Sequence, residues 1–553
     1  MTAKPHDCPS RQSQHGRQED SLRLLFVASE IFPLAKTGGL ADVCASLPPA
    51  IARLGVDVRL LMPAYAQAWE SVVAPQVVAD LGEVLPGAPV RLITGWTPDS
   101  GLPIWLIDCP VLFQRPGTLY QDPDGRDWPD NALRFGVLCH VAARIALGQA
   151  SLGWLPDVVH AHDWHTGLVP LLLRLAGDRR PRTVFTVHNA AFQGNFPLDY
   201  ATQLGLPHEV VAPDGAEFYG QLSFLKAGIR YADKVTTVSP TYAREIRTPE
   251  FGFGLEGLFE ARSEDLVGIM NGIDAALWNP ATDPHLSCRY SSDDAHGKRT
   301  CKSALQQQLG LDVDPLAPLV ACISRLTQQK MADVLFKHLP DMMERHPRLQ
   351  FALHGRGEPT LEEGFARLAR RYQGRVSVRI GYEESHAHHL HAGADILLHG
   401  SRFEPCGLTQ LYAMRYGTIP IVSRVGGLAD SVIDAGTRIS DVPDATGFVF
   451  DEPTGEAMHS ALSRCLNMYQ TRPRIWSALR KRAMSVDFGW VLSARKYAHT
   501  YAQLAPEFTL PPFAALLPAD MGMPAQRGCR AVPPHRPPVV MHTGQYLAIQ
   551  SST

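Results

Sequence analysis

Several features that would place a protein in a specialised class are missing from these 553 residues. No apolar run reaches about 18 residues, so we expect no membrane span. The first twenty residues, MTAKPHDCPSRQSQHGRQED, are polar and lack the apolar core of a secretory signal. The ten cysteines include no C-x-x-C pair, which argues against a zinc ribbon or a disulfide framework and favours reduced thiols in the cytoplasm.

An excess of positive charge is missing as well. The 52 Lys and Arg residues stand against 55 Asp and Glu residues, which gives a formal net charge of -3. We therefore expect no nucleic-acid partner. The hydrophobic fraction of 45% and the charged fraction of 19% are typical of a soluble globular protein, and the length predicts two or more domains.

Short β-branched runs alternate with amphipathic helical patterns in the first half of the chain. The predicted strands are 22–29, 56–63, 103–108, 157–162, 183–189 and 234–239, and helical patterns at 40–53, 131–148 and 165–176 lie between them. This alternation predicts an α/β fold, with a parallel sheet covered by helices on both faces.

A second series of the same kind follows in the second half. Its predicted strands are 318–324, 349–355, 375–381, 394–400, 418–423 and 447–450, separated by helical patterns at 328–338, 359–372, 407–416 and 455–469. We therefore predict two Rossmann-like, doubly wound domains that face an interdomain cleft. Ligands of such sheets bind at the carboxyl ends of the strands.

The predicted domain boundaries follow from composition. We expect domains at 22–274 and 317–487, joined by a linker region at 275–316 that is rich in Asp and Pro. Residues 1–21 and the proline-rich residues 507–553 are too poor in arranged apolar surface to form a core, so we expect both to be disordered.

The stretch EIFPLAKTGGLADV, residues 30–43, follows the first predicted strand. Lys36 stands in a turn, Gly38 and Gly39 allow close backbone approach, and Asp42 falls in the first turn of the next helix, with Glu30 on the other side of the turn. Such a turn is suited to phosphate binding, because helix N-termini attract anions. The alternative is a tight turn with a solvated lysine.

Two further polar clusters end strands of the first domain. VVHAHDWHTGL carries His160, His162, Asp163 and His165, a density that raises the question of a metal. No second ligand cluster accompanies them, and Asp163 at the carboxyl end of the strand is the better functional candidate. His188 and Asn189 end the next strand, where a histidine serves either the cleft or local hydrogen bonding.

The second domain offers cations and a carboxylate at strand ends. Arg325 and Lys330 in CISRLTQQK suit a diphosphate, although a solvated surface pair fits equally well. GSRFEPCGLTQ places Glu404 before Gly407 and a helix, and a second glycine pair, Gly426 and Gly427, opens another helix. We expect two helix N-termini at the cleft with one carboxylate between them.

Two Asp-x-Asp patterns are of the kind that metal-dependent sugar transferases use. Asp122 and Asp124 lie in an Asp/Pro/Gly stretch that reads as a turn, and Asp312 and Asp314 lie in the linker region. Neither is a convincing metal site, and we expect none.

KTGGLADV, HAHDWHTGL, TVHNAAFQG, MNGID, SRFEPCGLTQLYAMRYGT and GGLADSV together resemble the signatures of bacterial glycogen synthases and plant starch synthases, in the order of that family. The resemblance runs from about residue 22 to 505. It implies the GT-B fold, a retaining mechanism, and no metal or cofactor. The implied reaction transfers glucose from ADP-glucose to the 4-hydroxyl group at the non-reducing end of glycogen or another α-1,4-glucan.

The resemblance also implies roles for single residues. It places Lys36, Gly38 and Gly39 at the donor phosphates and glucose, and Arg325 and Lys330 at the diphosphate. Glu404 would hold the donor glucose, and Tyr382 would stack on the base. The further residues expected at the cleft are Glu30, Asp42, Asp163, His188, Asn271, Cys406, Gly407, Leu408 and Thr409. The helical segment 488–506 is expected to cross back onto the first domain.

Three positions depart from the family pattern. Met331 stands where a glycine usually follows Gln-Lys, Glu358 where aspartate is usual, and Gly400 where proline is common. Met331 bears on where the helix after Lys330 begins. Three rival functions are a sucrose- or trehalose-forming transferase, an inactive glycogen-binding paralogue, and a nicotinamide-dependent dehydrogenase. The last lacks a G-x-G-x-x-G motif after the first strand. The sequence leaves open a preference for ADP- or UDP-glucose and the oligomeric state.

Overall fold

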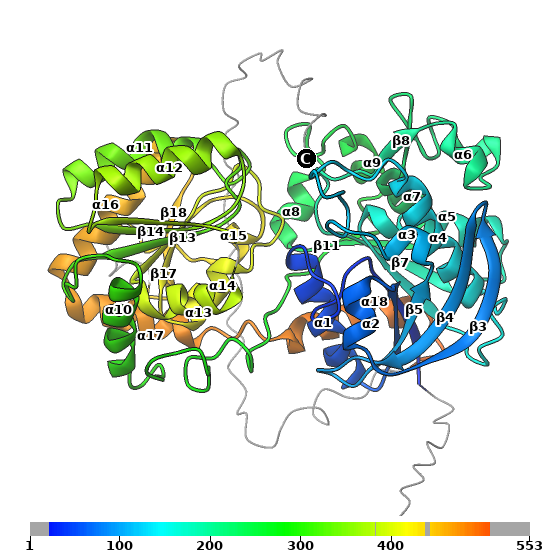
Figure 1. The fold of residues 1–553 in the computed structure, drawn as a ribbon, viewed down its shortest axis with the longest axis horizontal. Helices are drawn as coiled ribbons and strands as arrows, with labels where there is room; N and C mark the ends of the chain where they lie inside the picture. The colour runs from blue at the N-terminus through cyan, green and yellow to red at the C-terminus, as the bar shows by residue number, and fades with distance from the viewer. Residues whose placement is uncertain (1–20, 382, 437–442, 509–553) are drawn as a thin grey trace, which may run out of the picture.

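The computed structural model describes residues 21–381, 383–436 and 443–508, which form two α/β domains side by side (Figure 1). The predicted extensions 1–21 and 507–553 lie almost entirely outside the described residues, as does Tyr382. Among the described helices, each is too short or too polar to traverse a lipid bilayer.

The first domain is built on a nine-stranded sheet of order β12-β11-β7-β6-β1-β2-β5-β4-β3. All neighbours from β12 to β5 pair in parallel. These strands are nearly continuous apolar runs because helices cover both faces. They are β1 (Arg23–Val27), β2 (Asp57–Pro63), β5 (Pro103–Asp108), β6 (Val158–His162), β7 (Arg182–Val187), β11 (Lys234–Thr237) and β12 (Leu266–Gly268).

A long antiparallel ribbon that the sequence reasoning missed closes one edge of this sheet. It consists of β3 (Val73–Leu85) and β4 (Ala88–Trp96), and most side chains of β3 are exposed. Exposure on the outer edge removes the apolar run that reveals the central strands. A small second sheet, β8 (Asn195–Pro197), β9 (Glu217–Phe218) and β10 (Gln221–Ser223), was missed because its strands are only two or three residues long.

The helices of the first domain fill the connections between its strands. Those that carry the predicted amphipathic patterns are α1 (Gly39–Ala52), α4 (Asn131–Ala146) and α5 (Leu168–Leu175). The others are α2 (Ala66–Ser71), α3 (Pro110–Phe113), α6 (Tyr200–Gln203), α7 (Phe224–Tyr231), α8 (Pro240–Glu245) and α9 (Glu256–Ala261), with short 3-10 turns at Trp164–Thr166 and His208–Val210.

The second domain has a six-stranded parallel sheet of order β15-β14-β13-β16-β17-β18. Its strands are β13 (Leu319–Ile323), β14 (Gln350–Gly355), β15 (Val376–Ile380), β16 (Ile396–His399), β17 (Ile419–Ser423) and β18 (Phe448–Phe450). Its helices are α11 (Ala332–Arg345), α12 (Pro359–Arg371), α13 (Glu384–Gly393), α14 (Thr409–Arg415), α15 (Gly426–Ser431), α16 (Gly455–Thr471) and α17 (Pro473–Ser485).

The segment 275–316 is more than a linker. It contains a 13-residue helix, α10 (His296–Gln308), which packs against α13 of the second domain. The buried Lys298 on α10 donates to the carbonyl oxygens of Ala392 and Tyr416 at 3.0 Å each. The buried face of α10 mixes Lys298, Lys302 and Gln306 with Cys301 and Leu305, so its apolar pattern is weak and the sequence did not reveal the helix.

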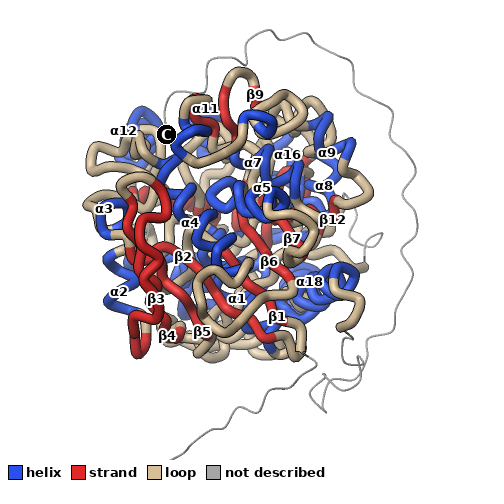
Figure 2. The backbone as a smooth tube through the Cα atoms, turned by 90° about the vertical axis from the view of Figure 1, so that its right-hand side faces the viewer, coloured by secondary structure: helices blue, strands red, loops and turns tan. Residues whose placement is uncertain are grey.

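The last described helix, α18 (Trp490–Leu504), returns to the first domain. Trp490, Tyr497 and Tyr501 join the core of that domain, and the helix packs beside α1 (Figure 2). The Tyr501 hydroxyl lies 2.7 Å from His160 Nδ1 on β6. The chain therefore connects the domains twice, once before α10 and once before α18.

Candidate active site

The carboxyl ends of the two sheets face each other across the interdomain boundary. A methyl group at Gly39, the first residue of α1, would lie 3.5 Å from Leu408 Cδ1 in the second domain. Ser239 Oγ donates to the Pro405 carbonyl at 2.7 Å, and Figure 1 shows α8 and α15 meeting at the same boundary. The loops that carry the predicted site residues thus meet in space.

The turn after β1 presents a lysine held between two acids. Lys36 Nζ lies 2.8 Å from Asp42 Oδ1 on α1 and 3.0 Å from Glu384 Oε2 on α13 of the other domain. Burial raises the pKa of Asp42, and Lys36 opposes that shift. Glu384 is a partner that sequence reasoning missed, because it lies 348 residues away along the chain.

Glu30 holds the same turn through a hydrogen bond to its backbone. Its carboxylate accepts a hydrogen bond from the Thr37 backbone N–H, and burial raises its pKa to about 7. Gly38 caps α1, and a methyl group there would have no atom within 4 Å. The backbone at the start of α1 therefore leaves open space on one side of Gly38, as close approach of an anion requires.

Asp163 ends β6 in an unusual backbone conformation. Its φ of 58° and ψ of 179° fall in a region that is populated almost only by glycine. Its carboxylate accepts from the backbone N–H groups of His188 at 2.8 Å and Asn189 at 3.4 Å. Burial raises the pKa of Asp163 to about 7 although these bonds oppose it. The carboxylate thus ties together two neighbouring strand ends.

His188 is held by a second histidine. Its Nε2 lies 3.0 Å from His162 Nδ1, and burial lowers the pKa of His188 to about 3. His160 uses both ring nitrogens within the protein, on Tyr501 and Thr186. Within the described ranges, no three potential ligands converge on a common metal position. The histidine cluster is a buried hydrogen-bonding network at the base of the site.

Glu404 is buried in the second domain among polar partners. Its Oε2 accepts from Lys330 Nζ and Ser401 Oγ, the latter at 3.1 Å, and lies 3.1 Å from His399 Nε2. Burial alone would raise the pKa of Glu404, but Lys330 and His399 hold it well below its usual range. The site therefore contains a buried carboxylate that stays ionised at neutral pH. His399 and Ser401 had no distinguishing signal in the sequence.

Arg325 and Lys330 do not act as one pair in this structure. The exposed Arg325 donates to Gln329 Oε1 at 3.2 Å, whereas Lys330 binds Glu404. The helix after them, α11, begins at Ala332, two residues beyond Lys330. Met331 caps it with a left-handed φ of 53°. Met331 thus adopts the conformation for which glycine is the usual residue.

The loop before α14 is shaped by a required glycine. Gly407 has a φ of 71°, and a methyl group there would lie 2.5 Å from Gln410 Oε1. Leu408 then caps α14, and Thr409 begins it. Cys406 is buried beside Asn271, and burial raises the pKa of its thiol to about 12. The loop thereby brings Cys406, Leu408 and Thr409 to the boundary with the first domain.

The second glycine pair lies at the N-terminus of α15. Gly426 N donates to Glu245 Oε1 at 2.9 Å, and Gly427 N donates to the Glu404 carbonyl at 3.1 Å. Glu245 belongs to α8 of the first domain, and burial raises its pKa to about 6. The backbone N–H groups at the N-terminus of α15 are therefore bonded within the protein, at the boundary between the domains.

The remaining sequence candidates lie elsewhere. Asp122 accepts from the backbone N–H groups of Asp124 and Arg126, which is the turn that the sequence predicts. Asp314 pairs with Arg348 at 2.8 Å. The predicted base-stacking Tyr382 lies outside the described residues.

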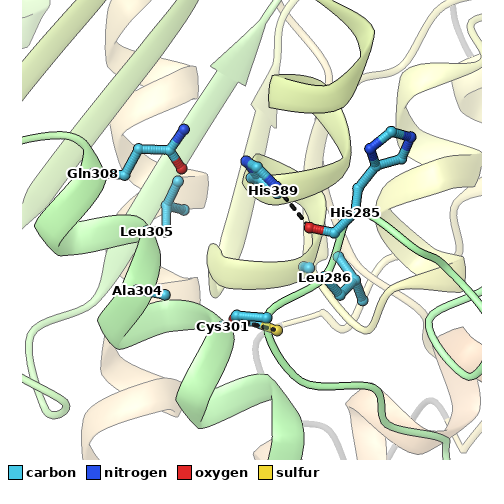
Figure 3. A pocket seen from close by; sticks show the side chains of 9 residues that line it. His285, Leu286, Cys301, Ala304, Leu305, Gln308 and His389 are labelled. Carbon is cyan, nitrogen blue, oxygen red and sulfur yellow. Dashed lines mark hydrogen bonds between the residues drawn. The ribbon is translucent and has the colours of Figure 1, made fainter.

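A cavity of about 280 Å³ opens on the second domain, between α10, α13 and the loop before α10 (Figure 3). His389 and Cys301 line it, and His389 Nε2 lies 2.7 Å from the His285 carbonyl. None of the residues predicted for the site lines this cavity, so it is separate from the boundary where Lys36 and Glu384 meet.

Comparison with known proteins places this geometry in a family. Residues 23–261 match the model of the starch synthase catalytic domain, and residues 306–482 match that of glycosyl transferases group 1. The glycogen synthase of Burkholderia thailandensis is 66% identical over 482 residues, which cover 87% of this chain and 90% of that protein. The glycogen synthase of Bordetella petrii is 49% identical over 515 residues, covering 92% of this chain and 98% of that protein.

Solved structures agree with these matches. The catalytic domain of starch synthase IV from Arabidopsis thaliana, bound to ADP and acarbose, superimposes with a TM-score of 0.79 at 33% identity, covering 88% of this chain and 100% of that one. A sucrose-phosphate synthase from Thermosynechococcus elongatus shares the fold, with a TM-score of 0.52 at 18% identity, covering 88% of this chain and 99% of that one. The chain therefore belongs to the glycogen synthase family of GT-B glycosyltransferases, enzymes that transfer glucose from a nucleotide sugar to a glucan.

Proposed function

We propose that the chain transfers glucose from ADP-glucose to the 4-hydroxyl group at the non-reducing end of an α-1,4-glucan, with retention of the anomeric configuration. We further propose that it does so in the cytoplasm and without a metal ion or cofactor. The observation that carries the proposal is the buried, ionised Glu404 with Lys330, beside the loop that begins α14 and across the boundary from the Lys36 turn.

The donor diphosphate is assigned to cations from both domains. Lys36 pairs with Asp42 and Glu384, and Lys330 pairs with Glu404, so each lysine already sits in a site that balances its charge. A bound diphosphate is also negative, so it can replace these carboxylates as the partner of the lysines. Arg325 is exposed and donates to the neutral Gln329 amide, so it can turn toward the same diphosphate.

The donor glucose is assigned to the space between Glu404 and His188. Because its pKa is about 3, His188 is neutral at physiological pH and binds sugar hydroxyl groups as an uncharged partner. Asp163 fixes the backbone of His188, and Asn271 supports Cys406 beside Gly407, Leu408 and Thr409. The nucleotide base of the donor is assigned to Tyr382. Gly38 and Gly39 present the backbone N–H groups of α1 to the donor.

The reaction balances without another reagent. The bond between the anomeric carbon and the diphosphate oxygen breaks, and a bond to the acceptor 4-oxygen forms. The proton of the acceptor hydroxyl passes to the departing diphosphate. The glucose becomes cationic at its anomeric carbon as the first bond breaks, and the ionised Glu404 stabilises that charge. Lys36, Lys330 and Arg325 take up the charge that develops on the diphosphate, which is the task of a metal ion in metal-dependent transferases.

The test is incorporation of labelled glucose into glycogen from ADP-glucose and from UDP-glucose, with and without primer and with EDTA. We expect primer-dependent incorporation from ADP-glucose that EDTA leaves unchanged. Loss of activity in EDTA that Mg²⁺ restores would overturn the metal-free account. Product formation with fructose or glucose phosphate, in place of glycogen, would identify a sucrose- or trehalose-forming enzyme. Absence of turnover with every donor would identify an inactive paralogue.

Glu404→Ala tests the site itself. Removal of one preorganised electrostatic group costs about 10²–10³ in kcat, so we expect a loss of at least about 100-fold with a smaller change in donor KM. Glu363→Ala, an exposed glutamate on α12, is the matched control. A folded Glu404→Ala enzyme with near-normal kcat would remove Glu404 from the mechanism.

A further inference from the structure

The three partners of Glu404 Oε2 come from two separate stretches of chain. Lys330 lies in the loop before α11, whereas His399 and Ser401 flank Gly400 at the end of β16. Any change in the spacing of these stretches alters how Lys330 meets the carboxylate. The contact that sets this spacing is therefore relevant to the site.

Met331 and Gly400 make that contact. A methyl group at Gly400 would lie 3.2 Å from Met331 Sδ and 3.5 Å from Met331 Cβ, and 3.1 Å from Met458 Cε. Met331 is fully buried and immediately follows Lys330, and Gly400 lies directly between His399 and Ser401. The thioether thus fills the space that a side chain at position 400 would need.

Polar bonds tie the same two stretches together around this contact. Arg402 N donates to the Gln329 carbonyl at 2.8 Å, and the Arg402 guanidinium binds Asp333 at 2.8 Å. Gln329 Nε2 donates to the Phe403 carbonyl at 3.3 Å. Because these bonds hold the stretches close, added volume between Met331 and Gly400 has no free direction in which to expand.

The backbone of Met331 makes the arrangement costly to maintain. A φ of 53° places a side chain in the left-handed region, where it is strained. Strained residues persist where the surroundings over-determine them, and they concentrate at functional sites. A buried methionine in this conformation, next to Lys330, therefore calls for a compensating role.

We infer that Met331 is a positioning residue whose side chain, packed against Gly400, sets how Lys330 meets Glu404. The inference rests on the proposed roles of Lys330 and Glu404. Two of the departures from the family pattern thereby have one explanation. The side chain of Met331 fills the space that the absence of a side chain at Gly400 leaves. Met331 is fully buried, so its proposed effect on the reaction passes through Lys330.

The test is a cycle of three variants: Met331→Gly, Gly400→Val and the double variant. Met331→Gly leaves a void and Gly400→Val overfills the contact, so we expect kcat to fall about fivefold or more in the first and about tenfold or more in the second. The double variant exchanges the small and the large residue. We expect it to recover at least about fivefold over Gly400→Val. Losses that multiply in the double variant would overturn the inference.

Three further measurements separate positioning from general damage. Gly364→Ala crowds Phe336 at 2.7 Å in the same domain, and we expect it to lower Tm but not kcat per folded molecule. Gly400→Ala is the milder variant if Gly400→Val does not fold, and a kcat equal to wild type in both Gly400→Ala and Met331→Gly would also overturn the inference. Lys330→Ala is measured in parallel. A fully active Lys330→Ala enzyme would refute the proposed site. An inactive Lys330→Ala enzyme, together with full activity of the variants at 331 and 400, would refute this inference alone.

Discussion

Single residues of this site are held in states that they would not adopt in water. Asp163 combines a glycine-like backbone conformation with a buried carboxylate of raised pKa. Its carboxylate accepts hydrogen bonds from the backbone N–H groups of His188 and Asn189, which holds the ends of β6 and β7 together and fixes the position of His188. The fold therefore tolerates both conformational strain and charge burial at one residue in order to fix the position of another.

The titration of Asp163 predicts how stability varies with pH. Its pKa is about 7 in the folded protein and about 3.9 in an unfolded chain. Below about pH 4 it is protonated in both states. Between about pH 4 and 7 the folded state binds more protons, so the free energy of unfolding falls as pH rises, and above pH 7 the loss is constant.

Asp163→Asn has no carboxyl group to titrate at this position, and an asparagine has nearly the same size and shape as the aspartate that it replaces. We expect its stability relative to wild type to rise between pH 4 and 7, by on the order of 2–4 kcal/mol. Urea denaturation at several pH values measures it, with Asp99→Asn on an exposed turn as the control. A stability difference that is independent of pH would contradict the shift.

Sequence patterns identified these residues one at a time but not their partners. The predicted Lys36, Asp163, His188, Lys330 and Glu404 all lie where the strand ends meet. Glu384 and Glu245 were missed, because nothing local marks a glutamate whose partner lies more than 180 residues away. Partnership across domains is a property of the fold, and one sequence carries no direct record of it.

At the scale of elements, the polar helix α10 shows where pattern reasoning fails. Its inward face carries Lys298, whose pKa burial lowers to about 7, and its neighbour Trp278 stacks between His388 and Tyr412 at 3.9 Å each. Central strands were predicted well because both of their faces are apolar. In α10, buried lysines and a glutamine interrupt the apolar period of the inward face, so the pattern is harder to recognise.

The first residue of α13, Glu384, forms an ion pair with Lys36 across the domain boundary, and this pair is called the latch. Glu384 binds Lys36 from the opposite domain, and the donor diphosphate is proposed to take that place. Both side chains are partly exposed, so the pair is worth at most about 1 kcal/mol. Glu384→Gln removes the competing charge, and we expect ADP to bind up to about fivefold more tightly in isothermal titration calorimetry.

Glu383→Gln is the matched control for this latch. Glu383 is the adjacent glutamate, and it pairs with Arg379 instead of Lys36. We expect its ADP affinity to stay within about twofold of wild type. Weaker ADP binding by Glu384→Gln would show that Glu384 supports the donor instead of competing with it.

At the scale of the whole molecule, the two domains are joined by more than their connecting segments. Thr241 on α8 binds Asp430 on α15 through its backbone N–H and its hydroxyl, each at 2.7 Å. Glu245 binds Gly426 beside them, and Ser239 binds Pro405. These contacts and the Lys36–Glu384 pair, together called the clasp, hold the two domains together at their boundary.

Because the clasp consists of single hydrogen bonds and ion pairs, we expect the domains to exchange between a closed and an open arrangement, in an equilibrium that one substitution can shift. Asp430→Ala removes both Thr241 bonds, each worth about 1 kcal/mol, so the open arrangement should become about 5–30 times more populated. We expect a larger radius of gyration in solution scattering without donor, and ADP should reverse it because the diphosphate binds cations of both domains. Asp451→Ala, which breaks only the Arg424 pair within the second domain, is the control. A radius of gyration in Asp430→Ala equal to that of wild type would mean that the connecting segments before α10 and before α18, and not the clasp, set the distance between the domains.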